Sequence, residues 1–192
     1  MRFAQTIAVL LCASTLALAA AGCGGGSTKI YAGTKPDVWA STVCGALGDW
    51  AQGLKDDSTR LGTDLGNTKD LKVVKTKFVA FLVNAESSSR RMINTITGAG
   101  APAVKDGEAI QTQLVTGLGG AQASFARAIS RAKKLPTDNP QAFSTGVQNL
   151  GRDVQTELTA TGEKFSKLGD KYDDKTLNEA TSGEASCKQI SG

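Results

Sequence analysis

Apolar residues recur at intervals of three and four positions through four long segments of the chain, which is the repeat of an α-helix with one buried face. No segment of the sequence shows a sustained two-residue alternation rich in β-branched residues, so strands are not expected. Short glycine-, proline- or polar-rich stretches separate the four segments, and helices joined by short loops run antiparallel. The sequence therefore predicts an all-α protein, an up-down-up-down four-helix bundle.

Capping residues mark the expected ends of these helices. The first helix is expected to begin at Pro36 and to stop at Gly66, and Thr68 is expected to cap the second. Gly98 ends the second helix, and Gly169 is expected to stop the fourth. The predicted apolar stripes run from Trp39 to Leu54, from Leu71 to Ile96, from Ile110 to Ala132 and from Phe143 to Leu168.

Two features complicate this helical pattern. A short C-terminal helix containing Leu177 and Ala180 is expected to present Cys187. Many glycines fall inside the predicted helices, where each costs up to about 1 kcal/mol relative to alanine. Close helix–helix approach is one explanation of these glycines, and breaks or kinks are another. An interruption of the third helix is most expected at Leu118-Gly119-Gly120, but whether this helix is continuous through Gly117–Gly120 stays open from the sequence.

The N-terminal stretch has the parts of a secretory signal. Arg2 is followed by an apolar run from Ile7 to Ala21 in which Ser14 and Thr15 are the polar side chains. This run is shorter than the roughly 20 residues that a membrane-spanning helix needs, and Gly24–Gly26 breaks it. The segment is thus predicted to direct export and to be removed.

The residues at the end of this run, Ala20-Ala21-Gly22-Cys23, resemble the bacterial lipobox, although Ala20 stands where that pattern usually has leucine. The resemblance implies removal of residues 1–22 and attachment of acyl chains such as palmitate to Cys23. Residues 23–35 would then form a flexible tether and residues 36–192 the helical domain. The alternative is an ordinary secreted protein cut near Ala21, with a free thiol at Cys23.

The remaining cysteines indicate a disulfide. Cys12 leaves with the signal, and if Cys23 is lipidated two cysteines remain, Cys44 and Cys187, in an oxidising compartment. One Cys44–Cys187 disulfide would tie the first helix to the C-terminal tail. The alternative is a pair of buried free thiols.

The amino-acid composition excludes several classes of catalytic and metal-binding site. The chain has no histidine, which excludes Ser–His and Cys–His catalysis and the HExxH zinc motif, and it has no CxxC motif, so neither a metal nor a cofactor is expected. Its 22 basic and 18 acidic residues are interspersed, and pairs such as Arg90-Arg91 and Lys133-Lys134 are too short for a nucleic-acid site. The carboxylates considered as catalytic groups, all interpreted as surface acids, are Asp56, Asp57, Glu108, Glu157, Glu163, Asp170, Asp173 and Asp174.

The two tryptophans, Trp39 and Trp50, lie three helical turns apart and flank Cys44. One interpretation is core packing beside the disulfide. The other is an aromatic wall around a groove for an apolar ligand or a partner helix. Both interpretations remain open from the sequence.

The lipobox, the Gly/Ser-rich tether, the segment Trp39-Ala40-Ser41-Thr42-Val43-Cys44 and the late Cys187 together resemble the small secreted or lipid-anchored helical proteins of actinobacteria. The resemblance implies a location on the outer face of the cell membrane and a helical fold, and it carries no catalytic residue. We therefore expect a non-enzymatic envelope lipoprotein that binds a protein or an envelope component. The alternative is a small-molecule or lipid carrier with its site near Trp39 and Trp50.

Overall fold

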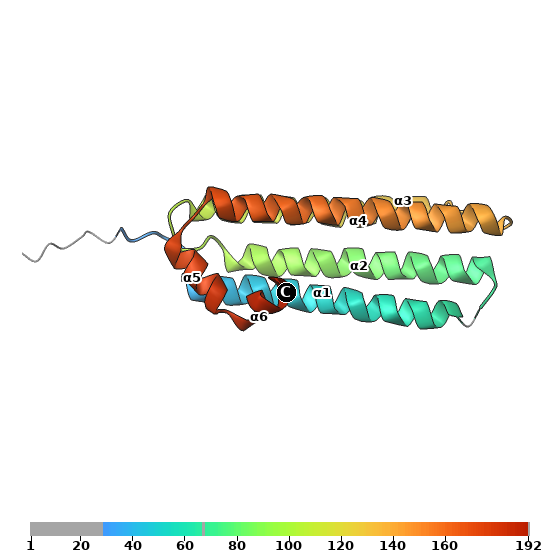
Figure 1. Cartoon of the computed structure of the whole chain (residues 1–192), viewed down its shortest axis with the longest axis horizontal. Coiled ribbons are helices and arrows are strands. Elements are labelled where there is room, and N and C mark those ends of the chain that lie inside the picture. Colours follow the sequence, from blue (N-terminus) through green and yellow to red (C-terminus); the bar gives the residue numbers. More distant parts are fainter. Residues whose placement is uncertain (1–28, 67, 192) are drawn as a thin grey trace, which may run out of the picture.

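Four long helices lie side by side and alternate in direction, and each is joined to the next by a short loop (Figure 1). The computed structural model describes residues 29–66 and 68–191, and these ranges contain no strand. The predicted up-down-up-down bundle is confirmed. Its helices are α1 (Pro36–Gly66), α2 (Leu71–Ala99), α3 (Gly107–Ala132) and α4 (Pro140–Lys171).

Each helix packs against its neighbour in the chain: α1 against α2, α2 against α3 and α3 against α4. Within the described residues, α1 and α4 are not in comparable backbone contact. The C-terminal segment instead returns to α1 as two short helices, α5 (Lys175–Gly183) and α6 (Ala185–Ser191). The end of the chain therefore packs against α1.

A disulfide joins Cys44 of α1 to Cys187 of α6, and this pairing is the one predicted from the number of cysteines. The two Cα atoms are 4.9 Å apart although 143 positions separate the residues in the sequence. The expected short helix with Leu177 and Ala180 is present, and the extended backbone at Glu184 divides it from a second short helix that presents Cys187. Leu177 lies in α5, and Cys187 lies in α6.

Several other boundaries differ from the expected ones. Asp70, rather than Thr68, caps α2, because the Asp70 carboxylate accepts a hydrogen bond from the backbone N–H of Lys72 at 2.8 Å. The hydroxyl of Thr68 instead accepts the N–H of Asp70. The fourth helix also continues past Gly169 to Lys171.

The third helix is continuous through Gly117–Gly120, so the possible break at Leu118-Gly119-Gly120 does not occur. Gly117 faces the ring of Phe165 in α4, and a Cβ atom at Gly117 would lie 2.8 Å from that ring. The helix is held on either side of the glycines by Leu114, Leu118 and Ala121, which are all buried. This burial outweighs a helix-propensity cost of about 1 kcal/mol per glycine.

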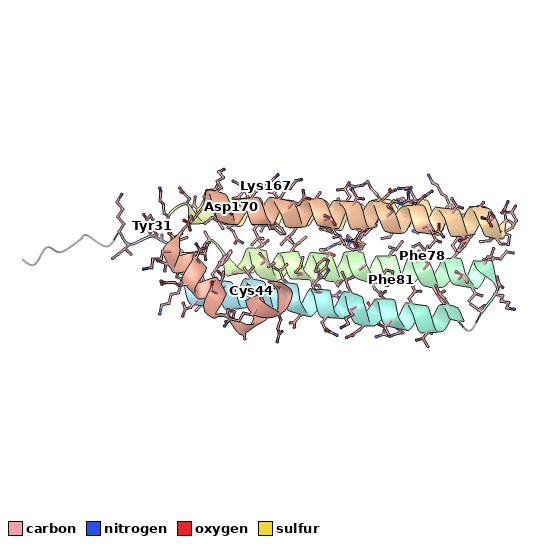
Figure 2. All side chains as sticks on the ribbon, in the orientation of Figure 1. Tyr31, Cys44, Phe78, Phe81, Lys167 and Asp170 are labelled. Atoms are coloured by element: carbon pink, nitrogen blue, oxygen red, sulfur yellow. A yellow bond between two sulfur atoms is a disulfide. The ribbon has the colours of Figure 1, made fainter. Side chains whose placement is uncertain are left out.

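The apolar interior divides into two clusters along the bundle axis. We call the end where residues 29–35, the α2–α3 loop and α5 lie the tether end, and the opposite end the distal end (Figure 1). Trp39, Ile96 and Leu177 belong to the tether-end cluster. Phe125 and Leu150 belong to the distal-end cluster, against which Phe78 and Phe81 of α2 pack (Figure 2).

The segment before α1 is attached to the tether end by backbone hydrogen bonds. Thr34 donates its N–H to the carbonyl of Ala101 at 2.8 Å and accepts the N–H of Ala103 at 2.7 Å. Gly33 precedes this bridge with a φ of 140°, and a Cβ atom there would lie 2.4 Å from the Ala101 oxygen, so only glycine fits. Residues 33 and 34 are thus part of the folded structure.

Candidate functional site

A groove of about 870 Å³ runs along the outside of the α1–α2 pair. Its residues on α1 recur at about one-turn intervals from Ser41 to Arg60, so the groove follows the helix axis. We call this feature the α1–α2 groove. Its lining residues include Gly45, Ala46, Asp49, Trp50, Gly53, Asp56, Asp57, Arg60, Ser87, Ser88, Arg91 and Met92.

The floor of the α1–α2 groove is apolar and its margins are polar. Met92 is buried, and Ala46 and Trp50 are half-buried and pack against the core. The margins carry Asp49 on one side and Arg91 on the other, both exposed. An apolar centre surrounded by a polar, charged rim is the arrangement found at protein–protein interfaces.

Gly45 and Gly53 leave two positions on the α1 wall of the groove without a side chain. A Cβ atom at Gly45 or at Gly53 would meet no atom within 4 Å, and both residues have helical backbones. Neither intrachain packing nor backbone geometry therefore requires glycine at these positions, although each costs up to about 1 kcal/mol of helix propensity.

Trp50 is held in the groove floor by a buried hydrogen bond. Its indole Nε1 donates to the hydroxyl oxygen of Ser89 at 3.0 Å, and that hydroxyl donates to the carbonyl of Ala85 at 2.7 Å. Ser89 is only 1 % exposed, so this chain of hydrogen bonds satisfies a polar group inside the core. The orientation of the Trp50 ring is thereby determined from α2.

Trp39 does not share a groove with Trp50. It is 5 % exposed, and its Nε1 lies 3.0 Å from both the carbonyl oxygen of Gly100 and the Oε1 of Gln111. Gln111 also donates to the carbonyl of Ile96 at 2.7 Å. Trp39 therefore joins α1 to the α2–α3 loop and to α3, which is the core-packing interpretation, and only Trp50 lines the α1–α2 groove.

The charges at the groove margins are mixed. Asp57 pairs with Arg60 at 3.3 Å, and Asp56 accepts a hydrogen bond from Gln52 at 2.8 Å. Arg91 donates to the Ser87 hydroxyl at 2.9 Å. These contacts lie within single helices and on exposed surface, so each is readily exchanged for a contact with a partner.

Glu86 lies on α2 outside the groove and joins that helix to α3. Its Oε1 accepts hydrogen bonds from Arg90 and from Gln122 of α3, each at 2.7 Å. The hydrogen bond from Arg90 is the main reason that the pKa of Glu86 is lowered from its ordinary value, and the Gln122 hydrogen bond acts in the same direction. Glu86 thus contributes to the α2–α3 contact as a carboxylate.

The candidate catalytic carboxylates do not form a common site. Asp173 and Asp174 accept hydrogen bonds at the start of α5, and Glu157 pairs with Arg127 at 3.3 Å. Glu108, Glu163 and Asp170 are exposed on α3 and α4. In residues 29–66 and 68–191 there is no group of three potential metal ligands, and no helix there is both long and apolar enough to cross a membrane.

Sequence reasoning located one wall of the groove and missed the other. Trp50 was singled out as a candidate, whereas Ser87, Ser88 and Arg91 look like ordinary surface residues of α2. Gly45 and Gly53 lie two turns apart on the α1 wall, but Gly119, Gly151 and Gly162 are equally open, so glycines alone do not identify the groove from the sequence. The lipid-attachment candidate Cys23 lies outside the described residues.

Comparison with known proteins adds no relative to this description. No protein-family model matches the chain, and neither a curated protein nor a solved structure matches it. The function must therefore be argued from the N-terminal sequence and from the surface of the bundle.

Proposed function

We propose that this protein is a non-enzymatic lipoprotein of the cell envelope that binds a helix of a partner protein in the α1–α2 groove. The observation that carries the proposal is the groove itself, with an apolar floor, a charged rim and glycines that the chain's own packing does not require. The lipobox-like end of the N-terminal apolar run supports attachment through Cys23 to the outer face of the membrane.

The dimensions of the groove suit a helix. From Ser41 to Arg60 the lining follows 19 residue steps of α1, which corresponds to about 28 Å and about five turns of a partner helix. The absence of side chains at Gly45 and Gly53 allows a partner helix to approach α1 closely. An amphipathic helix would place its apolar face over Ala46, Trp50 and Met92.

A groove-filling substitution tests this proposal. Gly53→Leu introduces a side chain into open space in the groove, while Gly151→Leu introduces the same side chain into open space on α4, outside the α1–α2 groove. A photo-crosslinker at Ser88 in the full protein, expressed in its own cells, should capture one partner. We expect Gly53→Leu to reduce this crosslink at least tenfold and Gly151→Leu to leave it unchanged.

If both leucine variants crosslink as well as the unmodified protein, the groove is not the partner site. The anchor is tested separately by replacing Cys23 with alanine, which should abolish acylation and release the protein from the membrane fraction. Continued acylation or membrane retention of the Cys23→Ala protein would contradict the lipoprotein assignment without affecting the result for the groove.

A second candidate function is a carrier for a small apolar ligand, and the position of Trp50 in the groove floor favours it. Native mass spectrometry of the protein extracted from its own membrane distinguishes the two. A small extra mass, together with a change in Trp50 fluorescence in a Trp39→Phe background, would support the carrier. Co-extraction of the crosslinked protein partner without such a mass would support helix binding.

A further inference from the structure

The distal end of the bundle brings together two lysine-rich segments that are far apart in the sequence. The Nζ atom of Lys75 near the start of α2 donates to the carbonyl of Leu135 in the α3–α4 loop at 3.1 Å, across 60 positions of the chain. Leu71 and Val74 pack against the core cluster that contains Leu135. The first turns of α2 and the α3–α4 loop therefore form one surface.

This surface is strongly basic. Residues 68–77 and 131–139 together contain seven basic side chains and two acidic ones, in a chain whose net charge is only +4. Lys77 pairs with Asp64 of α1, and Arg131 pairs with Asp153 of α4, so these two cations are compensated by acids on neighbouring helices. The remaining cations are Lys69, Lys72, Lys75, Lys133 and Lys134, which we call the basic tip.

The lysines of the basic tip are not neutralised by the protein. Across residues 29–66 and 68–191, none of them is in an ion pair, and all except the half-buried Lys75 are exposed. Asp70 and Asp138 are the two acids within these segments; the Asp70 carboxylate accepts the backbone N–H of Lys72, and neither acid is in an ion pair with these lysines in the described residues. Like charges gathered within about a Debye length of 8 to 10 Å produce a local positive potential that favours a polyanion.

The tether end has a different charge balance. Residues 29–38, 100–108 and 164–179 hold seven basic and seven acidic side chains. The net positive charge of the molecule is thus concentrated at the end farthest from the predicted lipid anchor. The length of α2, 29 residues, separates the two ends by about 43 Å.

We propose that the basic tip binds a linear phosphodiester polymer of the cell envelope. Exposed lysines act as separate point charges, and they suit a flexible chain of phosphates better than one bidentate anion, which would require arginine forks. The assignment to an envelope polymer depends on the extracytoplasmic location proposed above, and the basic tip lies about 43 Å along the bundle from the tether end. Binding to the polymer itself does not require the α1–α2 groove.

The test measures binding of a fluorescent glycerol-phosphate polymer to the full protein purified from its own membranes in neutral detergent. With about 0.7 counterions released for each lysine, the slope of log K against log salt should be roughly −3. Affinity should then fall about 60-fold between 50 and 200 mM salt. Replacing Lys69, Lys72, Lys133 and Lys134 with glutamine should remove most of the affinity and reduce the slope to near −1.

A matched control carries the same charge change elsewhere: glutamine at Lys29, Lys105, Lys164 and Lys167, which are exposed and lie at or near the tether end. This control should retain binding, and so should a variant with arginine at Lys69, Lys72, Lys133 and Lys134, which keeps the positive charges. Equal loss in the tip and control variants, an absent salt dependence, or tighter binding to phosphatidylglycerol vesicles at equal phosphate would overturn the proposal. The Gly53→Leu variant should bind the polymer normally, so failure of the groove proposal is distinguishable from failure of this one.

Discussion

At the tether end a disulfide, a backbone bridge and a hydrogen-bonded tryptophan surround the core, whereas at the distal end the helices are joined by short loops and apolar packing. The tether end is also neutral in its formal charge balance, and the distal end is basic. The end nearest the predicted anchor thus has covalent and polar connections. The far end carries the concentrated charge, and in the described residues it is held by apolar packing, the Lys75–Leu135 hydrogen bond and surface ion pairs, without a disulfide.

Removing the disulfide should have the largest effect and should act on the tether end. Closure of a loop of 143 residues restricts the unfolded chain, so replacing Cys44 and Cys187 with serine should lower the free energy of unfolding by about 4 kcal/mol. Urea unfolding measures this loss. In this variant, hydrogen exchange should show that α6 opens before the distal ends of α2 and α3. Uniform opening along the bundle would contradict the conclusion that the disulfide stabilises mainly the tether end.

The corresponding change at the distal end is Leu150→Ala. Leu150 is 2 % exposed in the distal-end cluster, and truncation of such a side chain costs about 3 kcal/mol. Because no covalent link restrains this end, hydrogen exchange near Ala132 and Phe143 should accelerate more than exchange near Cys44. An exposed control, Val83→Ala on α2, should change stability by less than 1 kcal/mol.

Trp39→Phe separates the polar connection from apolar packing at the tether end. Phenylalanine keeps most of the ring but removes the donor to Gly100 and Gln111, leaving acceptors in a buried region. We expect a loss of about 2 kcal/mol in urea unfolding. A matching Trp50→Phe variant removes only the hydrogen bond to Ser89 and should cost less. Equal stability of wild type and Trp39→Phe would show that the hydrogen bonds do not contribute.

Glu86→Gln, between the two ends, should have the smallest effect and one that depends on pH. The lowered pKa of Glu86 means that the folded protein stabilises the carboxylate, so its contribution is present above the unfolded-state pKa and disappears as the pH falls through the folded-state pKa. At pH 7 the variant should be less stable by about 1 kcal/mol. At pH 3 the difference should decrease, and a difference that grew with acid would refute the assignment.

Much of the fold could be predicted from the sequence because helix periodicity and capping are local. The apolar stripe from Trp39 to Leu54 and the helix ends near Gly66 and Gly98 are specified by residues that are close in the sequence. The disulfide was predicted from the two cysteines that would remain if residues 1–22 were removed and Cys23 were lipidated. The lipid anchor on Cys23 is a sequence-level prediction that these helices do not test.

The structure departs from local preference where distant contacts outweigh it. The third helix passes through Gly119 and Gly120 because buried residues on both sides hold it in place. The continuity of this helix cannot be read from propensity, since propensity differences of about 1 kcal/mol are smaller than the burial of several side chains. The cap of α2 is a local matter: Asp70 and Thr68 are both good capping residues, and the structure selects Asp70, whose carboxylate accepts the N–H of Lys72.

The candidate surfaces depended most on tertiary structure. The sequence by itself determined four amphipathic helices, one disulfide and an unusual set of glycines. Tertiary packing decided that Trp39 is enclosed while Trp50 lines a groove, because the α2–α3 loop and Gln111 cover only the former. Packing of α2 against α3 also brought Lys69, Lys72 and Lys75 close to Lys133 and Lys134. This matters because the electrostatic potential of a group of charges depends on their distances in space and not on their separation in the sequence.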